Sequence, residues 1–365
     1  MIEGGVVDSA SKWLSGNYDE NTRAEVKALI KRGGDPLIEA FYKDLDFGTG
    51  GMRGLMGAGT NRINVYTIGK ASQGMAIALT ESYPHQKVSI AIAYDCRNNS
   101  RLFAQTAAEV FSSNSIHVYL FSDPRPTPEL SFAVRELGCQ GGIVITASHN
   151  PKEYNGFKVY GEDGGQIVSP FDQELISKVR GLRIDQVKFH PQPALIHFLG
   201  EEMDQAYIGR IKTLSLSPED ISKQAEMPIV FTGIHGTGSV LVPKTLKEYG
   251  FKKVITVASQ DEINGNFPTV QSPNPEEPEA LGLAIELAKK KRAVLVMGTD
   301  PDADRVGIAV PNKQGEFIIL NGNQTGSLLV NYLLSKWKEK GKIDGNQFVA
   351  TTVVTTDLIN SLARA

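Results

Sequence analysis

Residues 142–151, Gly-Ile-Val-Ile-Thr-Ala-Ser-His-Asn-Pro, carry the strongest fold signal in this chain. The apolar run 142–145 predicts a buried strand, and Ser148 follows just beyond its carboxyl end. A second stretch has the same form, because the apolar run 293–297 precedes the acidic loop Asp300-Pro-Asp302-Ala-Asp304. Open α/β sheets place their ligand crevices at the carboxyl ends of such strands. The sequence therefore predicts an α/β fold with reactive loops at two strand ends.

Strand and helix patterns alternate along most of the chain, which is typical of parallel βαβ units. Residues 8–45 are expected to be helical, with a break at 32–36. Strands are predicted at 88–94, 116–121, 143–146, 229–231, 253–257, 293–297 and 348–354, with a hairpin of 306–310 and 316–320. Helices are predicted at 100–111, 129–137, 201–214, 242–249, 279–291, 321–338 and 357–365.

Length, charge and cysteine content narrow the class of protein. A chain of 365 residues is too long for one compact core. The net charge of −3 gives no electrostatic reason to expect nucleic acid or an anionic membrane as a partner. Cys96 and Cys139 have no metal-binding spacing, which fits a reducing compartment. There is no signal-peptide pattern and no apolar run of about 18 residues, so we expect a cytoplasmic protein.

The acidic loop predicts a metal site. Three alternating carboxylates at Asp300, Asp302 and Asp304 bring like charges together, and a cation is needed to neutralise them. Ligand sets made only of oxygen favour Mg²⁺. An EF-hand is excluded because Arg305 and Pro311 stand where glycine and glutamate are required. An aspartate that itself carries phosphate, as in some phosphatases, remains an alternative.

Ser148 next to such a metal, without an evident base–acid triad, favours phosphoryl transfer over acyl transfer. Its surroundings lack the G-x-S-x-G pattern of a hydrolase nucleophile. The alternative is a serine in an ordinary turn, because Asn150-Pro151 is a turn signal.

The glycine-rich segment 48–54, Gly-Thr-Gly-Gly-Met-Arg-Gly, is not a nucleotide motif. It lacks the lysine of a Walker loop, and Arg53 occupies the place of the last glycine in a dinucleotide fingerprint. Two readings stay open. One is a flexible loop, and the other is a phosphate-facing loop in which backbone N–H groups and the guanidinium bind oxygens.

The stretches 146–160 (TASHNPKEYNGFKVY) and 298–310 (GTDPDADRVGIAV) resemble the phosphoserine loop and the metal loop of the α-D-phosphohexomutases. That family includes phosphoglucomutase and phosphomannomutase. The resemblance implies that Ser148 carries phosphate in the resting enzyme. It also implies that Mg²⁺ is held by the three aspartates together with an oxygen on Ser148. Pro301 and Ala303 replace glycines found in many relatives, but both residues are compatible with the loop.

The resemblance also implies roles for other residues. Segment 48–54 is similar to the family's amino-terminal signature, so Arg53 is expected near the phosphoserine and Thr49 near phosphate. Arg305 is expected to face the same site. The alternative is that Arg305 forms an ion pair on the protein surface. Arg97 would hold the phosphoserine loop or contact phosphate, or else cap the following helix. His149 and Lys158 are the candidates for proton transfer, and the sequence assigns neither of them as the base.

The family has four domains, and the first three are similar α/β units. By that comparison we expect a first domain at 1–204, a second at 205–320 and the start of a third at 321–365, with the chain stopping inside the third. The substrate class implied is a sugar phosphate, and the oligomeric state stays open.

The expected reaction interconverts hexose 1-phosphate and hexose 6-phosphate, with glucose favoured, through a sugar bisphosphate. Mg²⁺ would be the cofactor and glucose 1,6-bisphosphate the activator. The wording of segment 48–54 favours the branch of phosphoglucomutases and phosphopentomutases. A phosphopentomutase, a sugar-bisphosphate synthase and a metal-dependent phosphatase remain alternatives, as does a catalytically incomplete chain that only binds phosphate and metal.

Overall fold

The structure is a computed structural model that describes residues 2–48 and 50–365. Thr49, predicted to contact phosphate, lies outside the described residues. The chain forms two compact units, one reaching Asp204 and including Asn264–Asn266, the other comprising Gln205–Ile263 and Phe267–Ala365. Residues 321–365 fall within the second unit, and their assignment to a separate third domain stays a prediction.

The first unit is built on a mixed sheet in the order β1-β5-β4-β2-β3-β6. Strands β4, β2, β3 and β6 are parallel, which confirms the βαβ prediction, while β5 and β1 add antiparallel pairs at one edge. The strands are β1 (Gly51–Leu55), β2 (Ser89–Tyr94), β3 (His117–Phe121), β4 (Gly141–Ile145), β5 (Tyr154–Gly161) and β6 (Ile196–Leu199). Strand β1 forms within the glycine-rich segment and was not predicted.

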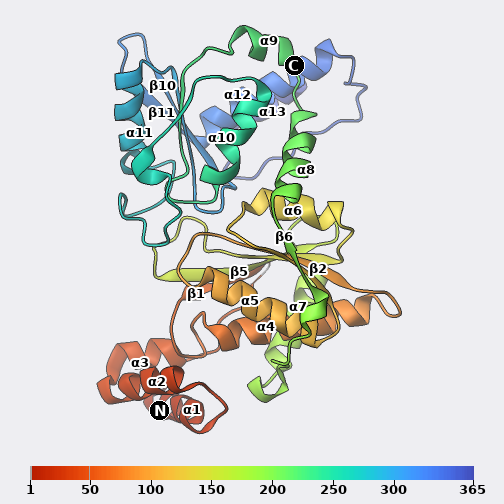
Figure 1. The fold of residues 1–365 in the computed structure, drawn as a ribbon, viewed down its shortest axis with the longest axis vertical. Coiled ribbons are helices and arrows are strands. Elements are labelled where there is room, and N and C mark those ends of the chain that lie inside the picture. Colours follow the sequence, from red (N-terminus) through yellow and green to blue (C-terminus); the bar gives the residue numbers. More distant parts are fainter. Residues whose placement is uncertain (1, 49) are drawn as a thin grey trace. The chain divides into compact units, whose positions relative to one another are not determined.

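Helices cover both faces of this sheet (Figure 1). They are α4 (Val65–Ser82), α5 (Ser100–Ser113), α6 (Thr127–Glu136) and α7 (Phe171–Gly181). Two adjacent glycines of β4 show the two layers, because successive residues of a strand face opposite sides. A side chain at Gly141 would meet Met75 of α4, and one at Gly142 would meet Val134 of α6.

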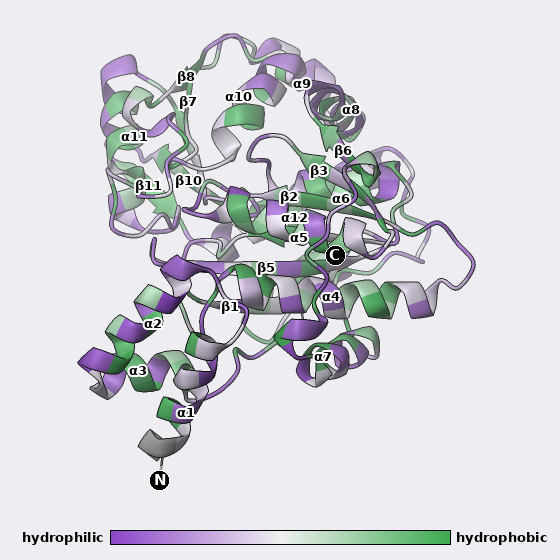
Figure 2. Ribbon diagram, turned by 60° about the horizontal axis from the view of Figure 1, so that its bottom comes forward, coloured by the Kyte–Doolittle hydropathy of each residue, from purple (hydrophilic) through white to green (hydrophobic). Residues whose placement is uncertain are grey.

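The amino-terminal residues form three helices, α1 (Ile2–Ser15), α2 (Glu20–Arg32) and α3 (Gly34–Phe41). Their buried cluster includes Trp13, Val26 and Phe41. In Figure 2, α2 carries alternating hydrophilic and hydrophobic bands, as expected of a helix with one buried face. The predicted break at 32–36 is confirmed between α2 and α3, where Gly33 and Gly34 have φ of 61° and 62°.

The second unit contains a sheet in the order β11-β10-β9-β7-β8. Its strands are β7 (Ile229–Thr232), β8 (Val254–Thr256), β9 (Leu295–Thr299), β10 (Val306–Pro311) and β11 (Phe317–Leu320). Its helices are α8 (Glu201–Lys212, which crosses the boundary between the units), α9 (Pro218–Lys223), α10 (Gly238–Tyr249), α11 (Pro278–Lys291), α12 (Gly322–Glu339) and α13 (Leu358–Arg364). As in the first unit, a parallel centre carries antiparallel strands at one edge, and the predicted hairpin is β10–β11.

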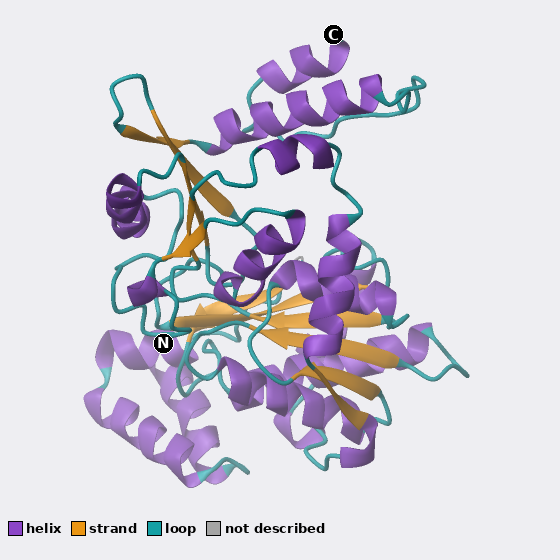
Figure 3. Ribbon diagram, turned by 45° about the horizontal axis from the view of Figure 1, so that its top comes forward, coloured by secondary structure: helices purple, strands orange, loops and turns teal. Residues whose placement is uncertain are grey.

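The predicted strand at 348–354 is wrong. Figure 3 shows this part of the chain, between α12 and α13, as loop. Phe348 is 88% exposed and Val353 is fully exposed. An extended segment becomes a strand only when a neighbouring strand accepts its backbone hydrogen bonds, and neither sheet pairs with these residues.

Among the described residues, no helix combines the length and the apolar character needed to cross a membrane.

Candidate active site

Ser148 lies in the loop that follows β4 in the first unit. Its side chain is nearly buried, at 3% exposure, and its φ of 52° lies in the left-handed region. A non-glycine residue in that conformation is strained by about 1–3 kcal/mol and is kept there only by surrounding contacts. One contact is local, because the Ser148 backbone N–H donates to Thr146 Oγ1 at 2.9 Å.

Arg97, which follows β2, supplies the main support of this loop. Its Nη2 donates to the carbonyl oxygens of Ser148, at 2.7 Å, and Asn150. Its Nη1 donates to the carbonyl oxygens of Pro151 and Tyr154, at 2.8 and 3.1 Å. The guanidinium thus binds the carbonyl oxygen of Ser148 and those of three residues that follow it in the loop.

Asp95 completes this support from the carboxyl end of β2. Its Oδ2 lies 3.4 Å from Arg97 Nε and accepts a 2.7 Å hydrogen bond from Thr146 Oγ1. Its Oδ1 accepts from the Arg97 backbone N–H and from Ser100 Oγ. The side chains of Asp95 and Arg97 are both fully buried. Asp95 and Thr146 therefore connect two parallel strand ends beneath Ser148, and neither residue was predicted as part of the site.

Two of the predicted residues lie close to Ser148: His149 is near its hydroxyl group, and Arg53 contacts its loop. His149 Nδ1 is 3.3 Å from Ser148 Oγ. Arg53 projects from β1, and its Nη1 donates to Asn150 Oδ1 at 2.6 Å. The exposed Arg53 side chain is thereby directed toward the Ser148 loop across the antiparallel edge of the sheet. Asn150 is a third residue, after Asp95 and Thr146, that sequence reasoning missed as a site contact.

Lys158 lies on β5, between β1 and β4. The strand register pairs it with Gly51 on one side and Val144 on the other. Gly51 has a φ of 135°, and a Cβ there would lie 1.8 Å from the Phe157 carbonyl oxygen. Only glycine fits this close approach of β1 to β5, which explains one of the glycines in segment 48–54.

The three aspartates gather in the second unit, in the loop between β9 and β10. Asp300, Asp302 and Asp304 each offer a carboxylate oxygen, and these oxygens lie within 4.8 Å of one another. Asp300 and Asp302 are fully buried, while Asp304 is exposed. Three carboxylate oxygens this close together could hold a metal ion, as the sequence predicted.

The acidic loop is held from behind by the turn after β7. The Thr237 backbone N–H and Oγ1 both donate to the Pro301 carbonyl oxygen at 2.9 Å. A Cβ on Gly236 would lie 2.5 Å from Pro301 Cα, so the two loops meet with no room for a side chain. Thr237 was not predicted, although a polar residue in a glycine-rich turn after a strand is the signal that would find it.

Two further residues near the acidic loop have clear contacts. Arg305 donates its backbone N–H to Asp300 Oδ1 at 3.2 Å, and its Nε lies 3.8 Å from Asp304 Oδ1. His235 is buried, and its ring nitrogens lie 3.0 Å from the Glu262 carbonyl oxygen and 2.9 Å from Thr269 Oγ1. His235 therefore anchors its own loop, whereas Arg305 borders the carboxylates.

Two family models match the chain. They are described as phosphoglucomutase/phosphomannomutase, alpha/beta/alpha domain I, at residues 44–183, and domain II, at residues 205–315. Together they span more than half of the chain and contain, respectively, the Ser148 loop and the three aspartates.

Curated relatives carry the name phosphoglucomutase. The protein of Staphylococcus epidermidis (strain ATCC 35984) is 39% identical over 337 residues, covering 89% of this chain and 59% of the relative. The protein of Staphylococcus aureus (strain MRSA252) is 38% identical over 353 residues, covering 92% of this chain and 62% of the relative. The chain thus spans about three fifths of the length of the curated relatives it matches.

Solved structures share the fold. A phosphoglucomutase/phosphomannomutase family protein from Burkholderia thailandensis matches with a TM-score of 0.60 at 24% identity, covering 79% of this chain and 58% of that one. The open form of the Paramecium exocytosis-sensitive phosphoprotein parafusin, a phosphoglucomutase, matches with a TM-score of 0.62 at 18% identity, covering 88% and 61%. With both domain models matched in order and relatives near 38% identity, the chain belongs to the phosphoglucomutase/phosphomannomutase family.

Proposed function

We propose that this protein interconverts glucose 1-phosphate and glucose 6-phosphate, with Ser148 as the phosphate carrier. The observation that carries the proposal is the support of Ser148, whose strained backbone is held by the buried Arg97–Asp95–Thr146 contacts. Such support is expected of a hydroxyl that must be presented in one geometry. The phosphoglucomutase relatives favour glucose as the sugar.

The proposed reaction consists of two phosphoryl transfers. In the first, the bond between Ser148 Oγ and phosphorus breaks, a sugar hydroxyl oxygen forms the new bond to phosphorus, and the proton of that hydroxyl is passed on to Ser148 Oγ. The product is glucose 1,6-bisphosphate. In the second transfer, Ser148 Oγ forms a bond to the other phosphoryl group and gives up its proton, and the sugar oxygen that leaves takes up that proton. The cycle is balanced without a nucleotide, and added glucose 1,6-bisphosphate would act as activator by phosphorylating Ser148.

Protein groups supply the proton transfers and the binding of phosphate. His149 is proposed to exchange the proton because its Nδ1 lies next to Ser148 Oγ, and Lys158 is the second candidate. Arg53, Arg305 and Thr49 are proposed phosphate contacts. Arg97 is proposed chiefly as a positioning residue, since its donors are directed at loop carbonyls.

Mg²⁺ is the proposed cofactor. Asp300, Asp302 and Asp304 would hold it, and the hard oxygens they gather fit this ion. An oxygen on phosphorylated Ser148 is the further ligand that we propose. The ion would supply neutralisation of the charge on the transferring phosphoryl group.

The test is phosphopeptide mapping after incubation with labelled glucose 1,6-bisphosphate and Mg²⁺. We expect acid-stable label on Ser148 that is lost on adding excess glucose 1-phosphate. Ser148→Ala should abolish the label, whereas Ser113→Ala, a partly buried serine of α5, should retain it. Hydroxylamine-labile label on an aspartate, with Ser148 unmodified, would overturn the proposal and favour a phosphatase-like reaction.

A further inference from the structure

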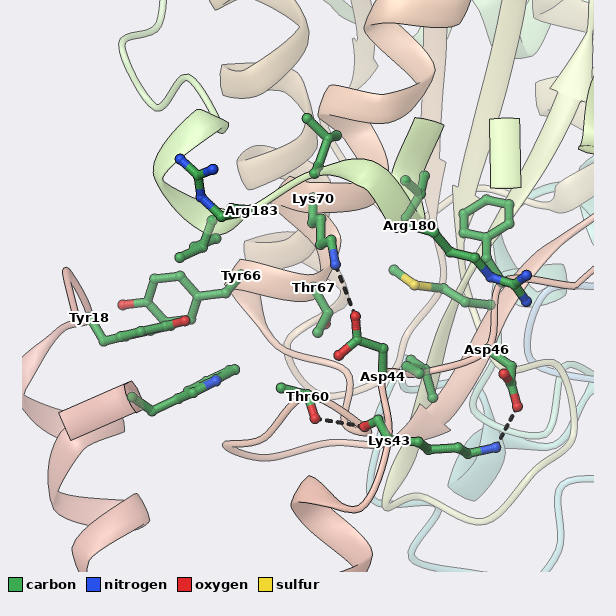
Figure 4. A pocket seen from close by; sticks show the side chains of 17 residues that line it. Tyr18, Lys43, Asp44, Asp46, Thr60, Tyr66, Thr67, Lys70, Arg180 and Arg183 are labelled. Carbon is green, nitrogen blue, oxygen red and sulfur yellow. Dashed lines mark hydrogen bonds and ion pairs between the residues drawn. The ribbon is translucent and has the colours of Figure 1, made fainter. Parts of the chain in front are cut away.

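A cavity of about 420 Å³ lies in the first unit (Figure 4). Its wall is formed by the amino-terminal helices, the segment 43–47, the start of α4 and the end of α7. Residues 146–151 do not line it. Its volume lies within the range of about 300–1,000 Å³ typical of sites for small molecules.

One wall of the cavity is aromatic and fixed in position. The rings of Trp13 and Tyr18 stack with their centroids 4.3 Å apart and an interplanar angle of 14°. Tyr66 meets Tyr18 edge-on at 4.6 Å, and its hydroxyl donates to the Asp19 carboxylate at 2.8 Å. Burial raises the pKa of Tyr18 to about 12, so its hydroxyl stays neutral at physiological pH. Aromatic walls of this kind offer rigid apolar area to the C–H face of a ring.

The rest of the lining carries more positive than negative charge. Lys70 pairs with Asp44 at 3.0 Å, and Lys43 pairs with Asp46. Because each of these pairs is neutral, the net positive charge of the lining comes from Arg180 and Arg183. These two side chains project from the end of α7 and from the segment after it (Figure 4). The cavity is therefore suited to an anion, and guanidinium groups are the preferred partners of phosphate.

The ion pair of Arg183 does not prevent such binding. Its Nη2 lies 2.8 Å from Asp185, but both side chains are largely exposed, at 73% and 62%. Ion pairs between exposed groups contribute about 0–1 kcal/mol, so a phosphate can compete for this guanidinium.

The same lining offers acceptors for hydroxyl groups. The Asp44 and Asp46 side chains are 64% and 68% exposed, and a carboxylate can accept several hydrogen bonds at once. An aromatic wall, two carboxylates and two arginines together match a hydroxyl-bearing ring that carries phosphate. We infer that this cavity is a second binding site for a sugar phosphate, separate from the Ser148 loop and independent of the reaction proposed there.

The cavity adjoins the strand that carries Arg53. Met52 of β1 lines it, and Lys43, Leu45 and Asp46 also line a neighbouring hollow of about 200 Å³ that contains Arg53. A bound sugar phosphate contacts this shared wall. It should therefore slow amide hydrogen exchange over residues 43–47, and unchanged exchange there at saturation would refute the contact.

Trp13 itself provides the binding assay. The chain has two tryptophans, so a Trp337→Phe background leaves Trp13 as the fluorescent reporter. Titration with glucose 6-phosphate should give a saturable change in Trp13 emission, while unphosphorylated glucose should give none. Arg180→Gln and Arg183→Gln should each weaken binding about tenfold or more, because each removes a charge-assisted contact. Arg32→Gln, an exposed arginine of α2 outside the cavity, is the matched control and should bind as the parent does.

Three results would overturn the inference. One is an absence of response to millimolar glucose 6-phosphate. Another is an unchanged affinity in both Arg180→Gln and Arg183→Gln, each shown to be folded by circular dichroism. The third is saturation by adenosine monophosphate without any response to glucose 6-phosphate, which would assign the cavity to nucleotides.

Discussion

Replacing Arg97 with methionine tests whether its guanidinium holds the Ser148 loop. The substitution keeps a long apolar stem but removes the charge and every donor of the side chain. Four loop carbonyls and the Asp95 carboxylate lose a partner, and the Asp95 side chain is fully buried. We expect the first unit to become less stable and the loop to lose its fixed conformation.

The magnitude follows from these contacts. Breaking a buried ion pair by removing one partner costs about 3–5 kcal/mol. The hydrogen bonds lost at the loop carbonyls add less to this cost than fully buried ones would, because Pro151 is exposed and water can bind part of the loop instead. The hydroxyls of Thr146 and Ser100 still donate to Asp95, which limits the loss. We therefore expect a decrease of about 4 kcal/mol in the free energy of unfolding, a large part of the roughly 5–15 kcal/mol typical of a domain.

Urea denaturation followed by Trp13 fluorescence, in the Trp337→Phe background, reports on the first unit. Arg101→Met is the matched control, because Arg101 is an exposed arginine four residues further on, in the first turn of α5, and its loss should change stability by less than about 0.5 kcal/mol. A lysine at position 97 should give an intermediate loss, since it keeps the charge but not the planar fork. A decrease below about 1 kcal/mol in Arg97→Met, or one equal to that of the control, would refute the reasoning.

Three further predictions concern the metal loop, a buried thiol and a glycine. Mg²⁺ should raise the melting temperature of the protein, because an ion that binds only the folded state stabilises that state. The Asp302→Asn variant should lose this increase, whereas the control Asp220→Asn, at an exposed aspartate, should keep it. An equal increase in both variants would exclude the aspartate site. Burial raises the pKa of the Cys139 thiol to about 11, so the stability this thiol contributes is complete at neutral pH and falls as pH rises toward about 11. Between about pH 9 and about pH 11, the free energy of unfolding of Cys139→Val should therefore fall less steeply than that of the parent protein, by up to about 1.4 kcal/mol per pH unit. Parallel plots of this free energy against pH for the two proteins would contradict the prediction. Gly51→Ala should lower the free energy of unfolding, measured by urea denaturation, by at least about 2 kcal/mol, because the new Cβ would clash with a carbonyl oxygen of β5. Gly181→Ala is the control, because a Cβ at that position meets no other atom, and its stability should change little. Equal losses in the two variants would argue against the clash.

The parts of the fold that follow from local patterns were predictable. The alternation of apolar runs and amphipathic segments between 88 and 146 gave strands β2 to β4 and helices α5 and α6 within a few residues. The hairpin β10–β11 was predicted from its turn, residues 312–315, where Gly315 has the positive φ of 81° that such turns favour. These elements are specified by residues close together in the chain.

Strands that depend on a distant partner were not predictable in the same way. Segment 51–55 is rich in glycine and looked like a loop, yet it forms β1 because β5 provides the backbone partner. Segment 348–354 has the composition of a strand but lacks a pairing strand in either sheet, and it remains loop. Composition alone cannot distinguish the two cases, because strand formation requires inter-strand hydrogen bonds.

The sequence by itself determined the chemistry available to this protein. It places Ser148 and the three aspartates directly after apolar strands, and the type and spacing of those residues already point to phosphate and metal. The resemblance pointed to Arg97 as a support of the Ser148 loop, but only the tertiary structure decided which contacts of Arg97, Asp95 and Thr146 hold Ser148 in place. Asp95 and Arg97 lie about fifty residues before the loop that they support, and parallel strands β2 and β4 must pair before their carboxyl ends meet. The contacts that fix the serine are set by this pairing, and no local pattern in the sequence encodes them.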